Sequence, residues 1–177
     1  MRIFIGIQLN EEAKHSLAIF QSHIKSASIK GNFSRKENFH LTICFIGEVE
    51  EGKLVHLEEQ LRKTLSDCSS FRIESGNPGV FEKKSGMIAW VGIKENFKLE
   101  EIYKKTKQAI AAAKFPVEER DYIPHITMGR KIRFAENAKD WTNNMPTFSE
   151  MIDAITIFQS HQVNGLLTYT PLIEIKL

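Results

Sequence analysis

Cysteine and proline are scarce in this chain, and neither sign of charge is in large excess. Its 177 residues include two cysteines, Cys44 and Cys68, and five prolines. Two isolated cysteines exclude a disulfide framework and a zinc ribbon, and they favour a reducing cytoplasm. Because no Pro/Ser-rich linker divides the chain, we expect residues 1–177 to form a single domain.

The formal charge is also close to balance, with 24 Lys+Arg against 22 Asp+Glu and a net charge of +2. This balance disfavours a protein that binds long duplexes, but an enzyme acting on nucleic-acid ends contacts few phosphates and is not excluded. No apolar run approaches the roughly 18 residues of a membrane span. The N-terminus begins directly with a strand pattern and has no signal-peptide anatomy. We therefore predict a cytoplasmic protein without a membrane partner.

The chain contains one pattern of elements twice. Ile3, Ile5, Ile7 and Leu9 alternate as in a strand, Asn10 is a candidate helix N-cap, and a second strand is predicted at 39–46. A strand at 88–93, a helix at 99–113 and a strand at 122–128 repeat this order. Gly92 follows Gly6 by 86 positions and His125 follows His40 by 85, which indicates a duplicated unit.

The remaining segments complete the predicted fold. Leucines at 54, 57, 61 and 65 form one stripe of a helix. Further strands are expected at 71–81, 147–158 and 166–175, the first with a bulge or turn near Gly76, Pro78 and Gly79. The pattern predicts an α+β fold, bilobal, in which duplicated strand–helix–strand units with mostly antiparallel sheets surround a central cleft.

Each half carries a His-x-Thr segment in its second strand, His40–Thr42 and His125–Thr127. Residues i and i+2 of a strand face the same side, so each histidine projects with its threonine, while Leu41, Ile43 and Phe45 are expected in the core. Two imidazoles suit general acid–base catalysis near neutral pH. The threonine hydroxyls can donate to phosphate oxygens. The four side chains predict a phosphodiesterase site that needs no metal.

Other interpretations of these residues remain open. A single His-x-Thr is most often structural, and two histidines can also bind zinc, although neither motif has a carboxylate on its strand face. Arg130 suits a phosphate clamp. Strict alternation places it on the face opposite His125, unless a bulge at Gly129 turns it back. His161 is left outside the site.

The residues around both motifs resemble those of the 2H phosphoesterase superfamily, in particular the RNA 2′,3′-cyclic phosphodiesterases formerly called 2′-5′ RNA ligases. Residues 37–47 resemble the first family motif and residues 124–130 the second. The opening residues 2–7 and the closing segment 169–177 also resemble the two ends of the family sequence. The resemblance implies a bilobal fold with both motifs at the base of its cleft. It also implies hydrolysis of RNA 2′,3′-cyclic phosphate ends to 2′-phosphates, with 2′-5′ ligation as the reverse reaction.

The same resemblance implies roles for individual residues. His40 is the expected proton donor and His125 the expected proton acceptor, while Thr42, Thr127 and Arg130 are expected to bind phosphate. The implied partner is RNA with cyclic ends, with tRNA fragments as one candidate source, acted on by a monomer without cofactor or metal. A cyclic nucleotide, an ADP-ribose cyclic phosphate, or a non-catalytic RNA-binding role would use the same scaffold.

Overall fold

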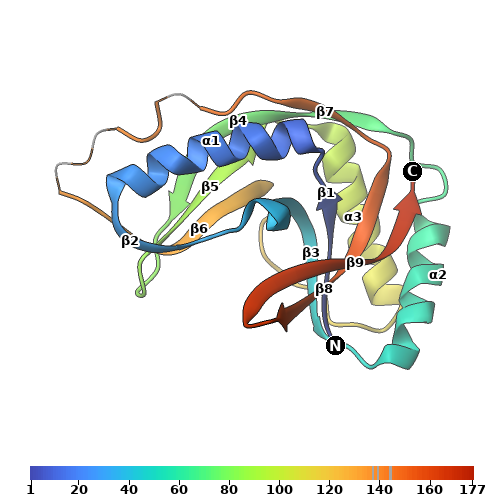
Figure 1. Cartoon of the computed structure of the whole chain (residues 1–177). Helices are drawn as coiled ribbons and strands as arrows, with labels where there is room; N and C mark the ends of the chain where they lie inside the picture. Colours follow the sequence, from blue (N-terminus) through green and yellow to red (C-terminus); the bar gives the residue numbers. More distant parts are fainter. Residues whose placement is uncertain (137, 139, 144) are drawn as a thin grey trace.

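The computed structural model describes residues 1–136, 138, 140–143 and 145–177 (Figure 1). The elements follow one another as β1 (Arg2–Gln8), α1 (Glu11–Ala27), β2 (Ser28–Phe33), β3 (His40–Glu48), α2 (Leu54–Thr64), β4 (Phe71–Phe81), β5 (Met87–Ile93), α3 (Phe97–Ala112), β6 (His125–Phe134), β7 (Ser149–Ile152), β8 (Ala154–Val163) and β9 (Leu166–Lys176). Two short 3-10 helices, Lys36–Asn38 and Glu51–Lys53, precede β3 and α2.

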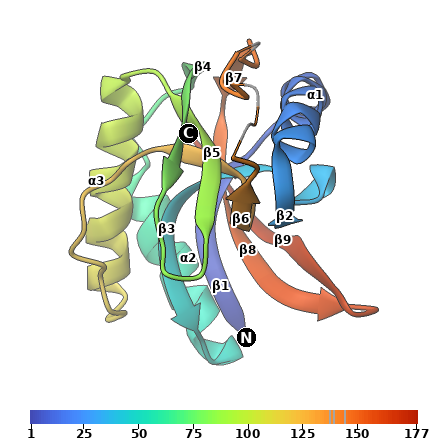
Figure 2. The same cartoon turned by 90° about the vertical axis from the view of Figure 1, so that its left-hand side faces the viewer.

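The strands form two sheets (Figures 1 and 2). The four-stranded sheet has the order β3-β1-β8-β9, and the five-stranded sheet has the order β2-β6-β5-β4-β7. Every neighbouring pair is antiparallel. The predicted α+β fold with antiparallel sheets is confirmed, and both His-x-Thr segments open a strand, β3 in one sheet and β6 in the other.

Asparagine side chains begin the first helix of each half. Asn10 Oδ1 accepts a hydrogen bond from the Ala13 N–H at 2.8 Å, as its predicted role as N-cap requires. Asn96 Oδ1 accepts from the Leu99 N–H at 3.0 Å in the same way. The apolar stripe predicts that this helix begins at residue 99, whereas α3 begins at Phe97. The stripe misses the first turn because Phe97 is exposed.

The first helix of each half, α1 or α3, packs against elements of the other half or of its sheet. Helix α1 follows β1 of the four-stranded sheet but packs against β2 and β6 of the five-stranded one. Gln21 of α1 donates both amide hydrogens across this contact, to the carbonyls of Ser34 and Met128 at 2.7 Å each. Helix α3 follows β5 of the five-stranded sheet and packs against β3 and α2. The two units are therefore interleaved.

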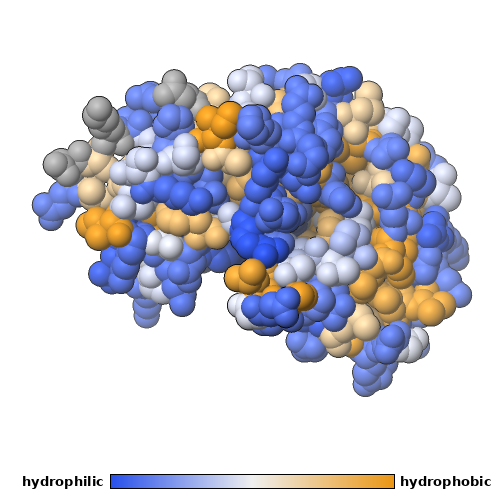
Figure 3. All heavy atoms as spheres, viewed as in Figure 1, coloured by the Kyte–Doolittle hydropathy of each residue, from blue (hydrophilic) through white to orange (hydrophobic). Residues whose placement is uncertain are grey.

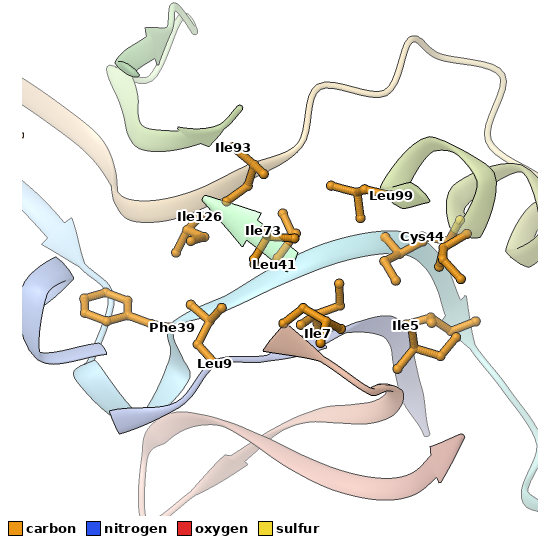
Figure 4. Packing of buried hydrophobic residues seen from close by; sticks show 14 of the residues in the cluster. Ile5, Ile7, Leu9, Phe39, Leu41, Cys44, Ile73, Ile93, Leu99 and Ile126 are labelled. Carbon is orange, nitrogen blue, oxygen red and sulfur yellow. The ribbon is translucent and has the colours of Figure 1, made fainter. Parts of the chain in front are cut away.

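One hydrophobic core lies behind both sheets (Figure 4). Leu41 of β3 and Ile126 of β6 occupy the middle position of the two His-x-Thr segments, and both are fully buried. Burial of an aliphatic side chain of this size contributes about 1.5–3 kcal/mol. Because the core holds this middle residue, the flanking histidine and threonine are held on the opposite face of the strand.

Strict alternation fails in β3 after Thr42. Between Thr42 and Cys44, β3 carries one residue more than β1 does, namely Ile43. Leu41 and Ile43 lie in the core as predicted, but Cys44 is buried as well and Phe45 is 42% exposed. The expectation that Phe45 lies in the core is wrong, because a bulge reverses the inward and outward positions that follow it.

Three strand predictions differ from the structure. The segment 28–33 forms β2, an edge strand that was not predicted. The strand expected at 147–158 is two strands, β7 and β8, which belong to different sheets and are separated at Asp153. The strand expected from residue 122 begins at His125, since Pro124 directly before it cannot donate to a ladder.

Among the described residues, no helix is long and apolar enough to cross a membrane.

Candidate active site

The two histidine rings are held by the same backbone hydrogen bond. His40 Nδ1 lies 2.7 Å from the Asn38 carbonyl oxygen, and His125 Nδ1 lies 2.6 Å from the Ile123 carbonyl oxygen. A carbonyl oxygen only accepts, so Nδ1 carries the proton in both rings. In the neutral form each ring therefore presents an unprotonated Nε2, the atom that can take up or deliver a proton.

The two threonines differ in their contacts. The Thr42 hydroxyl donates to His40 Nε2 at 2.9 Å. Thr127 pairs with Trp90 of β5 and shares the strand face of His125. Within the described part of the chain, its hydroxyl forms no hydrogen bond with the protein. One hydroxyl is thus engaged with its histidine, while the other is available to a ligand.

Aromatic side chains enclose His40. The ring centroid of Phe4 lies 4.7 Å from that of His40, Tyr169 meets it edge-on at 4.9 Å, and Phe158 lies at 6.0 Å. Asn38 fixes Tyr169 in this place, because its amide accepts from the Tyr169 N–H at 3.3 Å. The same amide donates to the Leu167 carbonyl at 2.8 Å. Asn38 therefore ties the β8–β9 hairpin to the His40 side of the cleft.

The residues that hold this hairpin were not predicted as part of the site. Asn38 lies more than a hundred positions from Leu167 and Tyr169, and no local pattern reports a contact over that separation. Tyr169 does belong to the C-terminal segment that resembles the 2H phosphoesterases, which was the one available signal.

His125 has a different aromatic neighbourhood. The ring of Phe81 meets it edge-on at 5.0 Å, and Trp90 lies at 6.0 Å. The Trp90 indole lies across Gly79, where a Cβ atom would come within 2.4 Å of the ring. Because Gly79 has no side chain, the Trp90 indole has room to lie beside His125.

Burial lowers the pKa of both histidines. For His40 the pKa falls from 6.5 to about 4, mainly through burial and further through the positive charges of Arg130 and His125, against the favourable Asn38 carbonyl. The pKa of His125 is also lowered, first by burial and then by Arg130 and Arg120. An imidazolium is disfavoured where water is excluded. Both rings are therefore neutral at pH 7 in the free protein, and a bound phosphate anion between them would raise both pKa values.

Arg130 lies on the same side of β6 as His125 and Thr127. In the pairing with β5, Trp90 is opposite Thr127 and Ala89 is opposite Gly129, so one residue of β6 has no partner at this point. This bulge reverses the alternation and brings Arg130 back to the cleft face, which agrees with the charge that both histidines sense. The exposed guanidinium can thus reach an anion between the two rings.

A cavity of about 230 Å³ opens beside the two motifs. Thr42 and His125 line it, and it continues between β3 and α3 past Cys44 and Tyr103. The Tyr122 hydroxyl, which donates to the Thr42 carbonyl at 3.1 Å, closes its wall. The ring of Tyr122 also stacks on that of Tyr103, with 4.2 Å between the ring centroids, and therefore packs as part of this wall.

His161 lies in β8, where its Nε2 is 2.7 Å from the Thr170 hydroxyl. Neither side chain belongs to the residues that line the cavity. The described residues contain no group of three or more His, Cys, Asp or Glu side chains arranged to hold a metal ion.

Known proteins resemble this chain over most of its length. A sequence model of the 2′-5′ RNA ligase superfamily matches residues 15–164. An RNA 2′,3′-cyclic phosphodiesterase of Methanocaldococcus jannaschii is 33% identical over 152 residues, which cover 85% of this chain and 83% of the relative. A protein of the same name from Thermotoga maritima is 28% identical over 163 residues, covering 90% and 87%.

Solved structures resemble it as well. E. coli LigT complexed with 3′-AMP superposes with a TM-score of 0.79 at 21% identity, over 99% of this chain and 97% of LigT. A Thermus thermophilus protein gives a TM-score of 0.81 at 20% identity, over 100% and 98%. These two likenesses establish a common fold.

Proposed function

The chain belongs to the 2′-5′ RNA ligase superfamily, and on that premise we propose that it hydrolyses 2′,3′-cyclic phosphate ends of RNA to 2′-phosphates without a metal. One observation carries this proposal. Two imidazoles, each with Nδ1 bonded to a backbone carbonyl and Nε2 unprotonated, lie within electrostatic reach of each other and of one arginine.

The reaction needs one proton acceptor and one proton donor. His125 Nε2 takes a proton from water, and the resulting hydroxide attacks phosphorus. The bond between phosphorus and the 3′-oxygen then breaks, and protonated His40 gives its Nε2 proton to that oxygen. The ring is left open with a 2′-phosphate, and proton transfer back between the two histidines through water restores the starting state.

His40 can act as the acid once the phosphate is bound. The negative phosphodiester raises the pKa of the adjacent imidazole, which reverses part of the effect of burial. With a proton on His40 Nε2, the Thr42 hydroxyl no longer donates to this atom and is free to donate to a phosphate oxygen. Thr127 and Arg130 would hold the remaining oxygens, where negative charge grows in the transition state.

The names of the relatives support RNA ends as the substrate class. We propose that the protein acts as a monomer, a single domain of two lobes, on RNA ends such as those of tRNA fragments in the cytoplasm. 2′-5′ ligation is not required for this role. In it the 5′-hydroxyl of a second RNA strand would take the place of water: its oxygen would attack the cyclic phosphate, the bond between phosphorus and the 3′-oxygen would break, and His40 would again protonate the leaving oxygen.

The decisive experiment uses an oligonucleotide with a 2′,3′-cyclic phosphate, incubated with the protein in EDTA. We expect a 2′-phosphate product, identified by mass and by its resistance to a 3′-specific phosphatase. An intact cyclic end, or a 3′-phosphate product, would contradict the proposal. A parallel panel of cyclic mononucleotides and ADP-ribose cyclic phosphate separates RNA ends from smaller phosphoesters.

A further inference from the structure

Lys30, Arg130 and Arg133 of the five-stranded sheet are exposed and have no acidic partner among the described residues. Elsewhere in the molecule lysines such as Lys94 and Lys105 pair with carboxylates. In the described residues, Lys30, Arg130 and Arg133 form no salt bridge. Cations left without partners beside one another repel, so their joint presence favours an anionic ligand.

The strand register places these cations side by side. Lys30 of β2 pairs with Arg133 of β6, and Asn32 pairs with Arg130. Between these two pairs β2 has one residue, Gly31, whereas β6 has two, Lys131 and Ile132. Lys131 accommodates the extra residue with a left-handed φ of 53°. Because Lys30 and Asn32 share a strand face, their partners Arg133 and Arg130 share it too.

The opposite face of the same strands belongs to the core. A Cβ atom on Gly31 would lie 2.9 Å from Ile132 and 3.1 Å from Phe33, and one on Gly129 would lie 3.0 Å from Phe33 and 3.1 Å from Ile132. These four residues thus crowd together behind the sheet. The three cations lie on the other side, which is the side of His125 and Thr127.

The cation row begins at the candidate active site and leads away from it. Arg130 affects both histidines electrostatically. Arg133 lies three residues further along β6, a distance of about 10 Å in a strand. Figure 2 shows β2 beside β6, and the space-filling view in Figure 3 shows a hollow below the region where Figure 1 draws these two strands.

Aromatic side chains line the same face next to this row. Phe81 and Trp90 lie 5.1 Å apart and both contact His125. Cations that follow a groove, interspersed with aromatic rings, are typical of surfaces that bind single-stranded nucleic acid.

We propose that Arg133 and Lys30 bind backbone phosphates of the RNA nucleotides upstream of the cyclic end, with Arg130 on the reacting phosphate. This inference rests on the proposed function and narrows its substrate to oligonucleotides. A cyclic mononucleotide carries only the reacting phosphate and cannot reach Arg133 or Lys30. A strand several nucleotides long places further phosphates along the row.

The test compares a 2′,3′-cyclic mononucleotide with a six-nucleotide RNA that ends in the same cyclic nucleoside, over a series of salt concentrations. Each phosphate contact on a single strand adds about −0.7 to the slope of log affinity against log salt. With three contacts, kcat/KM for the oligonucleotide should fall with a slope of about −2, against about −0.7 for the mononucleotide.

The variant Lys30→Gln with Arg133→Gln removes the two outer cations, both of which are exposed. Its slope on the oligonucleotide should shrink to about −0.7, with a loss in kcat/KM of about tenfold or more at low salt. Hydrolysis of the mononucleotide should be unchanged. The matched control, Lys63→Gln with Lys104→Gln, removes the same charge from exposed positions on α2 and α3 and should leave both slopes unchanged.

The outcomes separate the two proposals. Equal slopes for both substrates, or an equal effect of the control variant, would overturn the cation row while leaving the hydrolase function intact. Absence of hydrolysis on both substrates would overturn the proposed function itself, and this inference with it.

Discussion

Around His40 three aromatic rings and the β8–β9 hairpin close off the imidazole, whereas His125 contacts two rings and opens onto a cavity. Both rings nevertheless have the same tautomer, fixed by a carbonyl two residues earlier. The chain has thus repeated the position and orientation of the imidazole and varied its surroundings. Duplicated geometry with unequal burial is one way to give two identical side chains different proton affinities.

The largest expected effect comes from removing either histidine. His40→Ala and His125→Ala should each reduce kcat/KM roughly 10²–10⁴-fold, since each removes one proton transfer. The double variant should be little worse than either single one, because the two groups act in one step. Turnover of the cyclic-ended oligonucleotide measures this. His161→Ala is the control and should keep full activity; a single variant that stays active would refute the paired mechanism.

Removing either threonine hydroxyl should have the next largest effect. Thr42→Val and Thr127→Val are each expected to lower kcat about 10²-fold, the usual loss for one donor to a developing negative charge. Only Thr42→Val should also shift the His40 imidazole resonances in NMR, because only Thr42 donates to its histidine. Thr→Ser at each position keeps the hydroxyl and should restore most activity. Equal NMR changes in both rings would argue against the asymmetry.

The pH dependence should reveal the unequal burial. A histidine with a lowered pKa loses its proton at lower pH, and the free enzyme needs one proton on the pair. Since the pKa of His40 is about 4 and that of His125 is below 6.5, kcat/KM should fall about tenfold per pH unit above pH 6.5. In the complex the phosphate raises both pKa values, so kcat should persist to higher pH. A kcat/KM that stays level up to pH 8 would contradict this expectation.

The smallest expected effects concern two glycines that look equivalent in sequence. An alanine Cβ at Gly6 would lie 2.7 Å from the Leu41 carbonyl oxygen, and one at Gly92 would lie 3.0 Å from the Asn77 carbonyl oxygen. We expect Gly6→Ala to destabilise by about 1–3 kcal/mol, and Gly92→Ala by less. Urea unfolding measures both. A larger loss for Gly92→Ala would mean that the ring of Trp90, 3.3 Å away, resists displacement more than the backbone at Leu41 does.

The register of these two glycines could not be predicted from their spacing in the sequence. Their spacing supported the duplication, but Gly6 pairs with Thr42 whereas Thr127 pairs with Trp90. The structural counterpart of Gly6 is therefore Trp90, and Gly92 lies opposite His125. The order of strands and helices is therefore duplicated, but the two glycines are not equivalent positions. Each is required by a different close contact.

Features with a local periodic signal were predictable, and features set by distant neighbours were not. The 71–81 strand and the apolar positions of α2 follow from side-chain alternation and the helical stripe, and the structure agrees with both. The polar edge strand β2 has no apolar period of its own and exists because β6 supplies its hydrogen bonds. Phe45 and Arg130 each follow a bulge, and a bulge depends on the partner strand.

The interleaving of the two units bears on how such a protein can be divided. The five-stranded sheet, built mainly by the second half, includes β2 and is covered by α1. The four-stranded sheet, which begins with β1 and β3, includes β8 and β9, and α3 packs against its strand β3. A polypeptide cut between α2 and β4 would leave two fragments, each with an uncovered sheet face and a helix lacking its support. Neither fragment could assemble half a site alone, and catalysis would return only when the two fragments were folded together, by complementation.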